Sequence, residues 1–163
     1  MTRWITTTMV CLISMSCSPT GINPTHCRDG KCTYTFEENK HVRILPPVDR
    51  MQVADGDSLV FTYLYQQDEP SRFFDDEYDE RIFFQIDPSL DSFSFLNAEL
   101  NGAKMAFQPD CECFLEIVAI TNGTLSGTKL SKDRWEITMD VTFDWDQVPQ
   151  ERSFTAEFEL ETE

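Results

Sequence analysis

The most regular pattern in the chain is an alternation of apolar and polar residues near its C-terminus. From Arg134 to Trp145 every second residue is apolar, and Glu, Thr or Asp lies between. Ser153 to Glu161 repeats this pattern, with Phe154 and Phe158 on the apolar side. A period of two residues places alternate side chains on opposite faces of a strand. Both segments are therefore predicted to be half-buried strands.

Two further segments are more continuously apolar, Ser58–Tyr65 and Cys113–Thr121. Such runs are typical of strands that are covered on both faces, so we expect both near the centre of a sheet. Shorter strands are predicted at Thr33–Glu37, His41–Leu45, Arg81–Ile86, Ser92–Leu96, Lys104–Phe107 and Thr124–Leu130.

Turn-forming pairs separate these segments, at Pro46-Pro47, Asp55-Gly56, Asp87-Pro88, Asn101-Gly102 and Asn122-Gly123. The two Asn-Gly pairs are expected to form tight hairpin turns. No long helical periodicity occurs, and Asp91 to Ala103 has room for one helical turn at most. Short strands with regular turns predict an all-β fold, a β-sandwich or alternatively a barrel, of about 8–10 mostly antiparallel strands.

The N-terminal region has a different character. Arg3 is its only charge, Trp4 to Met15 is apolar or carries Thr and Ser, and small residues precede Cys17. This order is typical of an export signal peptide, and it is too short to cross a bilayer as a mature helix. We expect a signal at residues 1–16, a flexible Ser/Pro/Thr-rich tether at residues 17–26 and a single domain at residues 27–163.

The net charge narrows the range of partners. It is −16 for the whole chain, and removal of residues 1–16 takes away Arg3 and leaves −17. Binding to phosphates requires clustered Lys and Arg, so we expect no nucleic-acid partner and no adsorption to anionic headgroups. A membrane contact would then come from acyl chains. The other partner, a protein or a glycan, is left open.

Four cysteines lie in the predicted domain, and an even number in an exported domain indicates disulfides. Cys27 and Cys32 flank Asp29-Gly30, a strong hairpin signal, and would face each other at ~4.5 Å between Cα atoms. That separation suits a disulfide. On a strand, Cys111 and Cys113 would point to the same face. Three arrangements are then open: a small ring between the two, crosswise pairing with Cys27 and Cys32, or reduced thiols around a soft metal; disulfides are favoured.

The densest acidic stretch includes five carboxylates, Asp75, Asp76, Glu77, Asp79 and Glu80. Calcium prefers several oxygen ligands from one loop, so a calcium-dependent module is one alternative. The spacing is not that of an EF-hand. The other interpretation is a solvated loop that protects a sheet edge, and we expect no obligatory cofactor.

Catalytic motifs are missing from the sequence. It has two histidines, no Gly-x-Ser-x-Gly and no glycine-rich phosphate loop. We therefore expect a non-enzymatic binding or structural module. Two alternatives are a hydrolase based on paired carboxylates and a soft-metal carrier through Cys111 and Cys113, with His26 and Met105 as further ligands.

The residues around Cys17 resemble bacterial lipoprotein signals, in which the cysteine is lipidated and becomes the new N-terminus. With the tether and the acidic β-domain, including Ile120–Gly127 and Trp135–Ile137, the chain resembles uncharacterised outer-membrane lipoproteins of Bacteroidetes-like bacteria. The resemblance implies lipidation of Cys17 and an outer-membrane location, facing the periplasm or the cell surface. Ser18 and Pro19 after the cysteine are compatible with such sorting.

Overall fold

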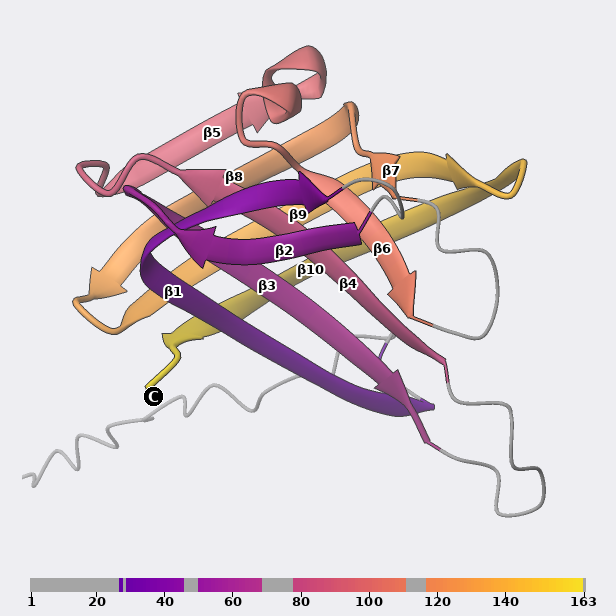
Figure 1. Ribbon diagram of the computed structural model, residues 1–163, viewed down its shortest axis with the longest axis horizontal. Coiled ribbons are helices and arrows are strands. Elements are labelled where there is room, and N and C mark those ends of the chain that lie inside the picture. Colours follow the sequence, from indigo (N-terminus) through magenta and orange to yellow (C-terminus); the bar gives the residue numbers. More distant parts are fainter. Residues whose placement is uncertain (1–26, 28, 46–49, 69–77, 111–116, 163) are drawn as a thin grey trace, which may run out of the picture.

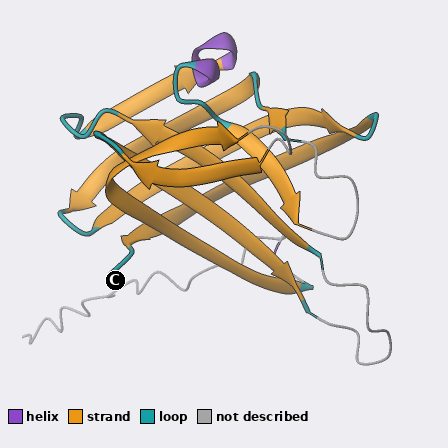
Figure 2. Cartoon of the chain, viewed as in Figure 1, coloured by secondary structure: helices purple, strands orange, loops and turns teal. Residues whose placement is uncertain are grey.

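The computed structural model describes residues 27, 29–45, 50–68, 78–110 and 117–162 (Figure 1). These residues form ten strands and a short 3₁₀ helix, which Figure 2 distinguishes by colour. The elements are β1 (Gly30–Leu45), β2 (Arg50–Asp55), β3 (Ser58–Gln67), β4 (Asp79–Ile86), β5 (Ser92–Leu96), η2 (Asn97–Asn101), β6 (Ala106–Asp110), β7 (Val118–Ala119), β8 (Asn122–Ser131), β9 (Arg134–Trp145) and β10 (Val148–Leu160). No helix among these residues has the length and apolar character needed to cross a bilayer.

The strands belong to one hydrogen-bonded sheet in the order β5-β8-β9-β10-β1-β3-β4-β6-β7, and β2 pairs with β1 beside this path. All pairings are antiparallel except that of β1 with β10, which is parallel. The sheet is not closed into a barrel. Its two parts, β5-β8-β9-β10 and β1-β3-β4-β6-β7, face each other with crossing strands (Figure 1), which confirms the predicted β-sandwich.

Aromatic side chains fill the space between the two parts. The ring of Phe61 on β3 stacks against Phe36 at 5.3 Å and against Phe84 at 4.8 Å between centroids. Trp135 of β9 meets Phe61 edge-on at 5.7 Å, so the contact joins opposite sides of the sandwich. Stacked and edge-to-face rings add to the free energy of area burial. The alternating aromatic positions of the sequence therefore become the core.

Strands β9 and β10 form the longest hairpin. Every second residue of β9 is buried, as its alternation predicts. The connection is the two-residue turn Asp146-Gln147, in which φ is +49° and +64°. Two positive φ values define a type I′ turn, whose twist matches that of the paired strands.

Strand β1 unites two segments that the sequence predicted separately. Its register with β3 shifts between Glu37 and Lys40, where Asn39 has a φ of +57°. Such a bulge bends the strand. The distal half of β1 then pairs with β2, a strand that the sequence analysis did not predict.

The β1–β2 hairpin covers the outer face of the sheet. A second apolar cluster unites Val42 and Met51 of the hairpin with Val60 of β3, and with Phe83 and Ala106. Two sheet glutamines hold the hairpin through its backbone: Gln85 Oε1 accepts from the Val42 amide at 3.0 Å, and Gln108 Oε1 from the Met51 amide at 2.7 Å. Strand β3 is thus covered on both faces, as its apolar run predicts.

Three sequence predictions of local structure were wrong. Asn122-Gly123 begins strand β8, where it pairs with β9, and Asn101-Gly102 lies at the end of η2; neither forms a hairpin turn. The predicted central strand Cys113–Thr121 appears only as the two-residue strand β7 at the end of the sheet, and residues 113–116 lie outside the described part. The turn preference of a residue pair and the apolar character of a segment are local properties. They do not specify which strands pair in the folded sheet, and that pairing determined the structure at these three positions.

Candidate functional site

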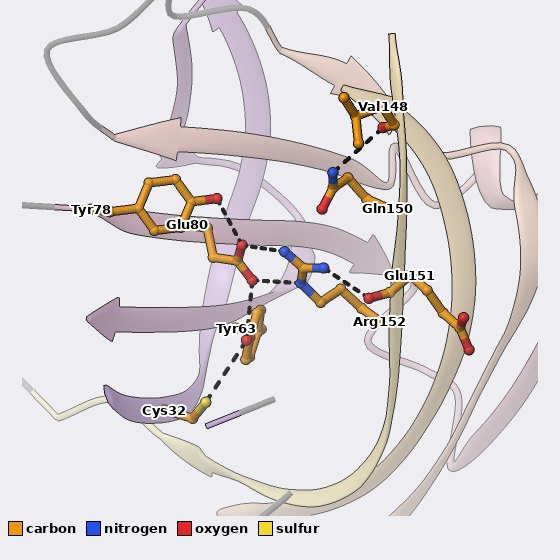
Figure 3. A network of polar contacts seen from close by, with 8 residues as sticks. All are labelled: Cys32, Tyr63, Tyr78, Glu80, Val148, Gln150, Glu151 and Arg152. Carbon is orange, nitrogen blue, oxygen red and sulfur yellow. Dashed lines mark hydrogen bonds and ion pairs between the residues drawn. The ribbon is translucent and has the colours of Figure 1, made fainter. Parts of the chain in front are cut away.

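The strongest polar constellation in the described residues is an ion pair inside the sandwich (Figure 3). Glu80 lies on β4 and Arg152 on β10, which are not neighbours in the sheet. Arg152 Nε donates to Glu80 Oε1 at 2.6 Å, and a terminal guanidinium nitrogen donates to Oε2 at 2.5 Å. The side chains are 3% and 15% exposed for Glu80 and Arg152. This two-point pairing joins the two parts of the sandwich and orients both groups.

Two tyrosines complete the surroundings of the carboxylate. The hydroxyl of Tyr63 donates to Glu80 Oε1 at 3.3 Å, and the hydroxyl of Tyr78 donates to Oε2 at 3.0 Å (Figure 3). Glu80 thus accepts four hydrogen bonds, which is about the capacity of a carboxylate. With every acceptor position occupied, this carboxylate connects β4 to β10 and to the two tyrosines.

The pKa values of the neighbouring groups follow from burial and from this charge pair. Burial raises the pKa of Tyr63 and of Tyr78, and the negative charge of Glu80 raises both further. Burial lowers the pKa of Arg152, but its hydrogen bonds and its attraction to Glu80 outweigh this and leave a net increase. The arginine stays charged and the tyrosines stay neutral at physiological pH.

The disulfide Cys27–Cys32 lies next to this network. The structure joins the two sulfurs, with Cα atoms 5.8 Å apart, as the sequence predicted. The Cys32 sulfur is 3.8 Å from the Tyr63 hydroxyl, and the Cys27 sulfur is 3.6 Å from that of Tyr34. Gly30 already pairs with Gln67 of β3, so the bridge does not close the expected two-residue hairpin. It fixes the start of the domain onto the sandwich.

Of the five predicted calcium ligands, the structure describes Asp79 and Glu80, whose side chains have different surroundings. Glu80 faces inward to Arg152, whereas Asp79 accepts a hydrogen bond from Gln66 at 3.2 Å in an exposed contact. No group of three or more His, Cys, Asp or Glu suited to a metal occurs among the described residues. The other predicted ligands and modification sites, Asp75, Asp76, Glu77, Cys111, Cys113 and Cys17, lie outside the described part, as does His26, while Met105 is buried in the core.

Sequence reasoning missed the network, although a signal was present. Arg152 lies an even number of residues before Phe154, Ala156 and Phe158, so the strand pattern places it on the same face of β10. Glu80 is likewise on the same face of β4 as Ile82. Opposite charges at positions that point to the core require a buried partner. The alternation along each strand does not reveal that Glu80 and Arg152 meet, because β4 and β10 are far apart in the chain.

Two of the hollows on the described surface have partly apolar linings next to the strands discussed above. One, of about 540 Å³, lies beside strand β5 and includes Asp57, Ile86, Asp87, Leu90 and Phe95 in its lining. The other, of about 450 Å³, lies between the β1–β2 hairpin and the segment before β7, and is lined largely by apolar side chains, among them Val42, Met51, Met105 and Ile117. Lys104, which also lines it, donates to the Val42 carbonyl at 3.4 Å. Both volumes are in the range of sites that bind small molecules or peptide side chains.

The geometry defines a disulfide-linked β-sandwich domain with a buried ion-pair network. Comparison with models of protein families, with curated proteins and with solved structures found no match. The functional argument therefore rests on the residues of this chain.

Proposed function

We propose that this protein is an exported, lipid-anchored β-sandwich that serves as a non-enzymatic binding or structural module of the bacterial outer membrane. The observation that carries the proposal is the arrangement of the N-terminal region relative to the disulfide. A signal-like segment ends at Cys17, and Cys27, ten residues later, is tied to Cys32 at the start of the domain. Disulfides persist in oxidising compartments outside the cytoplasm.

The tether sets how far the domain reaches from the anchor. An extended chain spans at most ~3.3–3.6 Å per residue, so the segment between Cys17 and Cys27 reaches roughly 35 Å. The lipidated cysteine would hold the domain within about that distance of the bilayer, with the first attachment point at Cys27, which is buried and bonded to Cys32. The inward-facing network supports a structural role for the interior, and binding then falls to surfaces and hollows of the domain.

Replacement of the predicted lipidation site tests the anchor. Cys17→Ala is expected to move the protein from the membrane fraction to the soluble envelope fraction and to abolish incorporation of labelled palmitate, because the acceptor thiol is gone. Cys11→Ala, within the signal, is the matched control and should leave retention unchanged. Membrane retention of the Cys17→Ala protein equal to that of the original would contradict the proposal.

A further inference from the structure

Strand β5 lies at the end of the sheet that the described residues form. It pairs with β8 on one side, and no described strand pairs with its other side. The amide of Lys129 donates to the Asp91 carbonyl at 2.9 Å. Because backbone groups alternate in direction along a strand, those of Phe93 and Phe95 also point to β8, and those of Ser92 and Ser94 point away. The outward amide of Leu96 is already bonded to Glu99, at 2.9 Å.

This edge lacks most features by which sheets avoid new partners. Its five residues, Ser-Phe-Ser-Phe-Leu, include no charge and no proline, and the edge is protected only by its short length and by the bond of Glu99 to the Leu96 amide. The side chain of Leu96 is 55% exposed. Phe93 packs into the core over Gly127, where a Cβ atom would lie 2.5 Å from the ring, so the strand is held firmly on its inner side. Strand β5 is thus fixed by its core contacts, while no described strand pairs with its outer side.

A groove runs beside the same strand. The hollow of about 540 Å³ is lined by Phe95 of β5, by Leu90 and by Ile86, and two carboxylates, Asp57 and Asp87, also line it. A strand added next to β5 would direct every second side chain to the side of Phe95. The groove offers such side chains an apolar surface with negative charges within reach.

The acidic residues on either side of β5 favour a basic partner. The stretch from Asp87 to Gly102 includes Asp87, Asp91 and Glu99 and no Lys or Arg. Lysine and arginine have long apolar stems and charged ends, so they can lie on Phe95 and Leu90 while their charge approaches a carboxylate. A second copy of this chain, with its net charge of −16, would meet repulsion at the same edge.

We propose that strand β5 is a docking edge for an extended, basic segment of a partner protein. The segment adds a strand beside Ser92 and Ser94 and places Lys or Arg side chains in the groove lined by Asp57 and Asp87. Main-chain hydrogen bonds supply affinity and the groove supplies specificity, as in other strand-addition complexes. The inference rests on the proposed function, for which it names the partner.

The test uses the full chain and a blocked six-residue peptide of alternating lysine and valine. The peptide should shift the amide resonances of Ser92 and Ser94 in a titration followed by NMR. Ser94→Pro should weaken binding at least tenfold, because it removes an outward amide and no bond to β8. Ser94→Ala is the matched control and should bind as the original does. A peptide with glutamate in place of lysine should not bind.

Proline is tolerated on edge strands and at the first position of a strand. If Ser94→Pro lowers the melting temperature by more than a few degrees, Ser92→Pro replaces it in the same comparison. The inference is overturned by a lysine peptide that leaves the β5 amides unshifted, by equal binding to the proline and alanine variants, or by equal binding of the glutamate peptide. Dimers that Ser94→Pro dissociates would overturn it in favour of a second copy. None of these outcomes affects the Cys17→Ala test of the anchor.

Discussion

At the level of single residues, the interior depends most on the charge of Arg152. Its guanidinium is held by Glu80 at two points, and a further guanidinium nitrogen donates to the carbonyl of its neighbour Glu151 at 2.8 Å. Phe143 lies beneath it, with the guanidinium carbon 5.9 Å from the ring centroid. A buried charge with such partners is tolerated, whereas the same charge without its carboxylate is strongly destabilising. The two members of the pair are therefore needed together.

Glu80→Gln tests this dependence. It is expected to lower the free energy of unfolding by about 3–5 kcal/mol, because Arg152 is left buried without a counter-charge. The double variant Glu80→Gln/Arg152→Met should recover most of the loss, since it removes both charges. Urea unfolding followed by tryptophan fluorescence measures both.

An exposed ion pair serves as the control for this experiment. Arg134 and Glu157 are 3.2 Å apart with both side chains about half exposed, so Glu157→Gln should cost less than about 1 kcal/mol. Equal losses from Glu80→Gln and Glu157→Gln would contradict a special role for the buried pair.

At the level of elements, the turns are where local sequence and observed structure differ most. The type I′ turn between β9 and β10 uses Asp146-Gln147, although its two left-handed residues suit Asn-Gly best. The two Asn-Gly pairs of the chain lie elsewhere. The long alternating strands on either side decide the position of the turn, because their register buries Phe143 and Phe154. A shift by one residue would turn every side chain of one strand to the wrong face.

Replacement of Asp146-Gln147 by Asn-Gly should stabilise the protein. Left-handed backbone costs an ordinary residue roughly 1–2 kcal/mol, and Asn and Gly avoid most of this. The expected increase is about 1 kcal/mol, or roughly 2–4 °C in melting temperature for a chain of this length. Thermal unfolding followed by circular dichroism measures it.

The turn between β8 and β9 is the matched control. Lys132-Asp133 connects two strands with the same loop length, but neither residue has a positive φ. Asn-Gly at this turn should bring no gain, and it removes the hydrogen bond that the Ser131 hydroxyl donates to the Asp133 carboxylate. A gain at both turns would show that backbone conformation is not the cause.

At the level of the whole molecule, three of the four tyrosines belong to the buried network or pack against it: Tyr63 and Tyr78 bond to Glu80, and the ring of Tyr34 lies 5.7 Å from that of Tyr63. Tyr65 makes an exposed bond to the Asp29 carbonyl. Burial raises the pKa of Tyr34 to about 12, and it also raises the pKa of Tyr63, Tyr78 and Tyr65. A pKa that is higher in the folded than in the unfolded protein means that folding favours the protonated form. This contribution to stability is complete below pH ~10, the unfolded value, and is lost as the pH rises through the folded values.

The protein should accordingly unfold cooperatively in alkaline solution. Absorbance of ionised tyrosine at about 295 nm is expected to rise steeply above pH ~11, together with the loss of β-sheet circular dichroism, because Tyr63 and Tyr78 ionise only on unfolding. Tyr78→Phe should reduce the total amplitude by about a quarter and make the transition less steep, because one of the groups with a raised pKa is gone. Gradual ionisation centred near pH ~10 with the sheet intact would contradict the buried network.

The sequence alone determined the all-β class, the long β9 strand, the central place of β3 and the Cys27–Cys32 bridge. These follow from period-two alternation, apolar runs and short separation in the chain, all of which are local properties. The positions of the signal, the tether and Cys17 are likewise read from local composition, and they stay predictions.

Only the tertiary structure decided how these elements combine. The parallel pairing of β1 with β10 and the ion pair of Glu80 with Arg152 join residues far apart in the chain. The folding of the β1–β2 hairpin over β3 and the unpaired side of β5 among the described strands likewise depend on how the whole sheet assembles. The physical reason is that a strand pattern specifies which side chains turn inward, whereas the partner of each strand depends on the packing of the whole sheet.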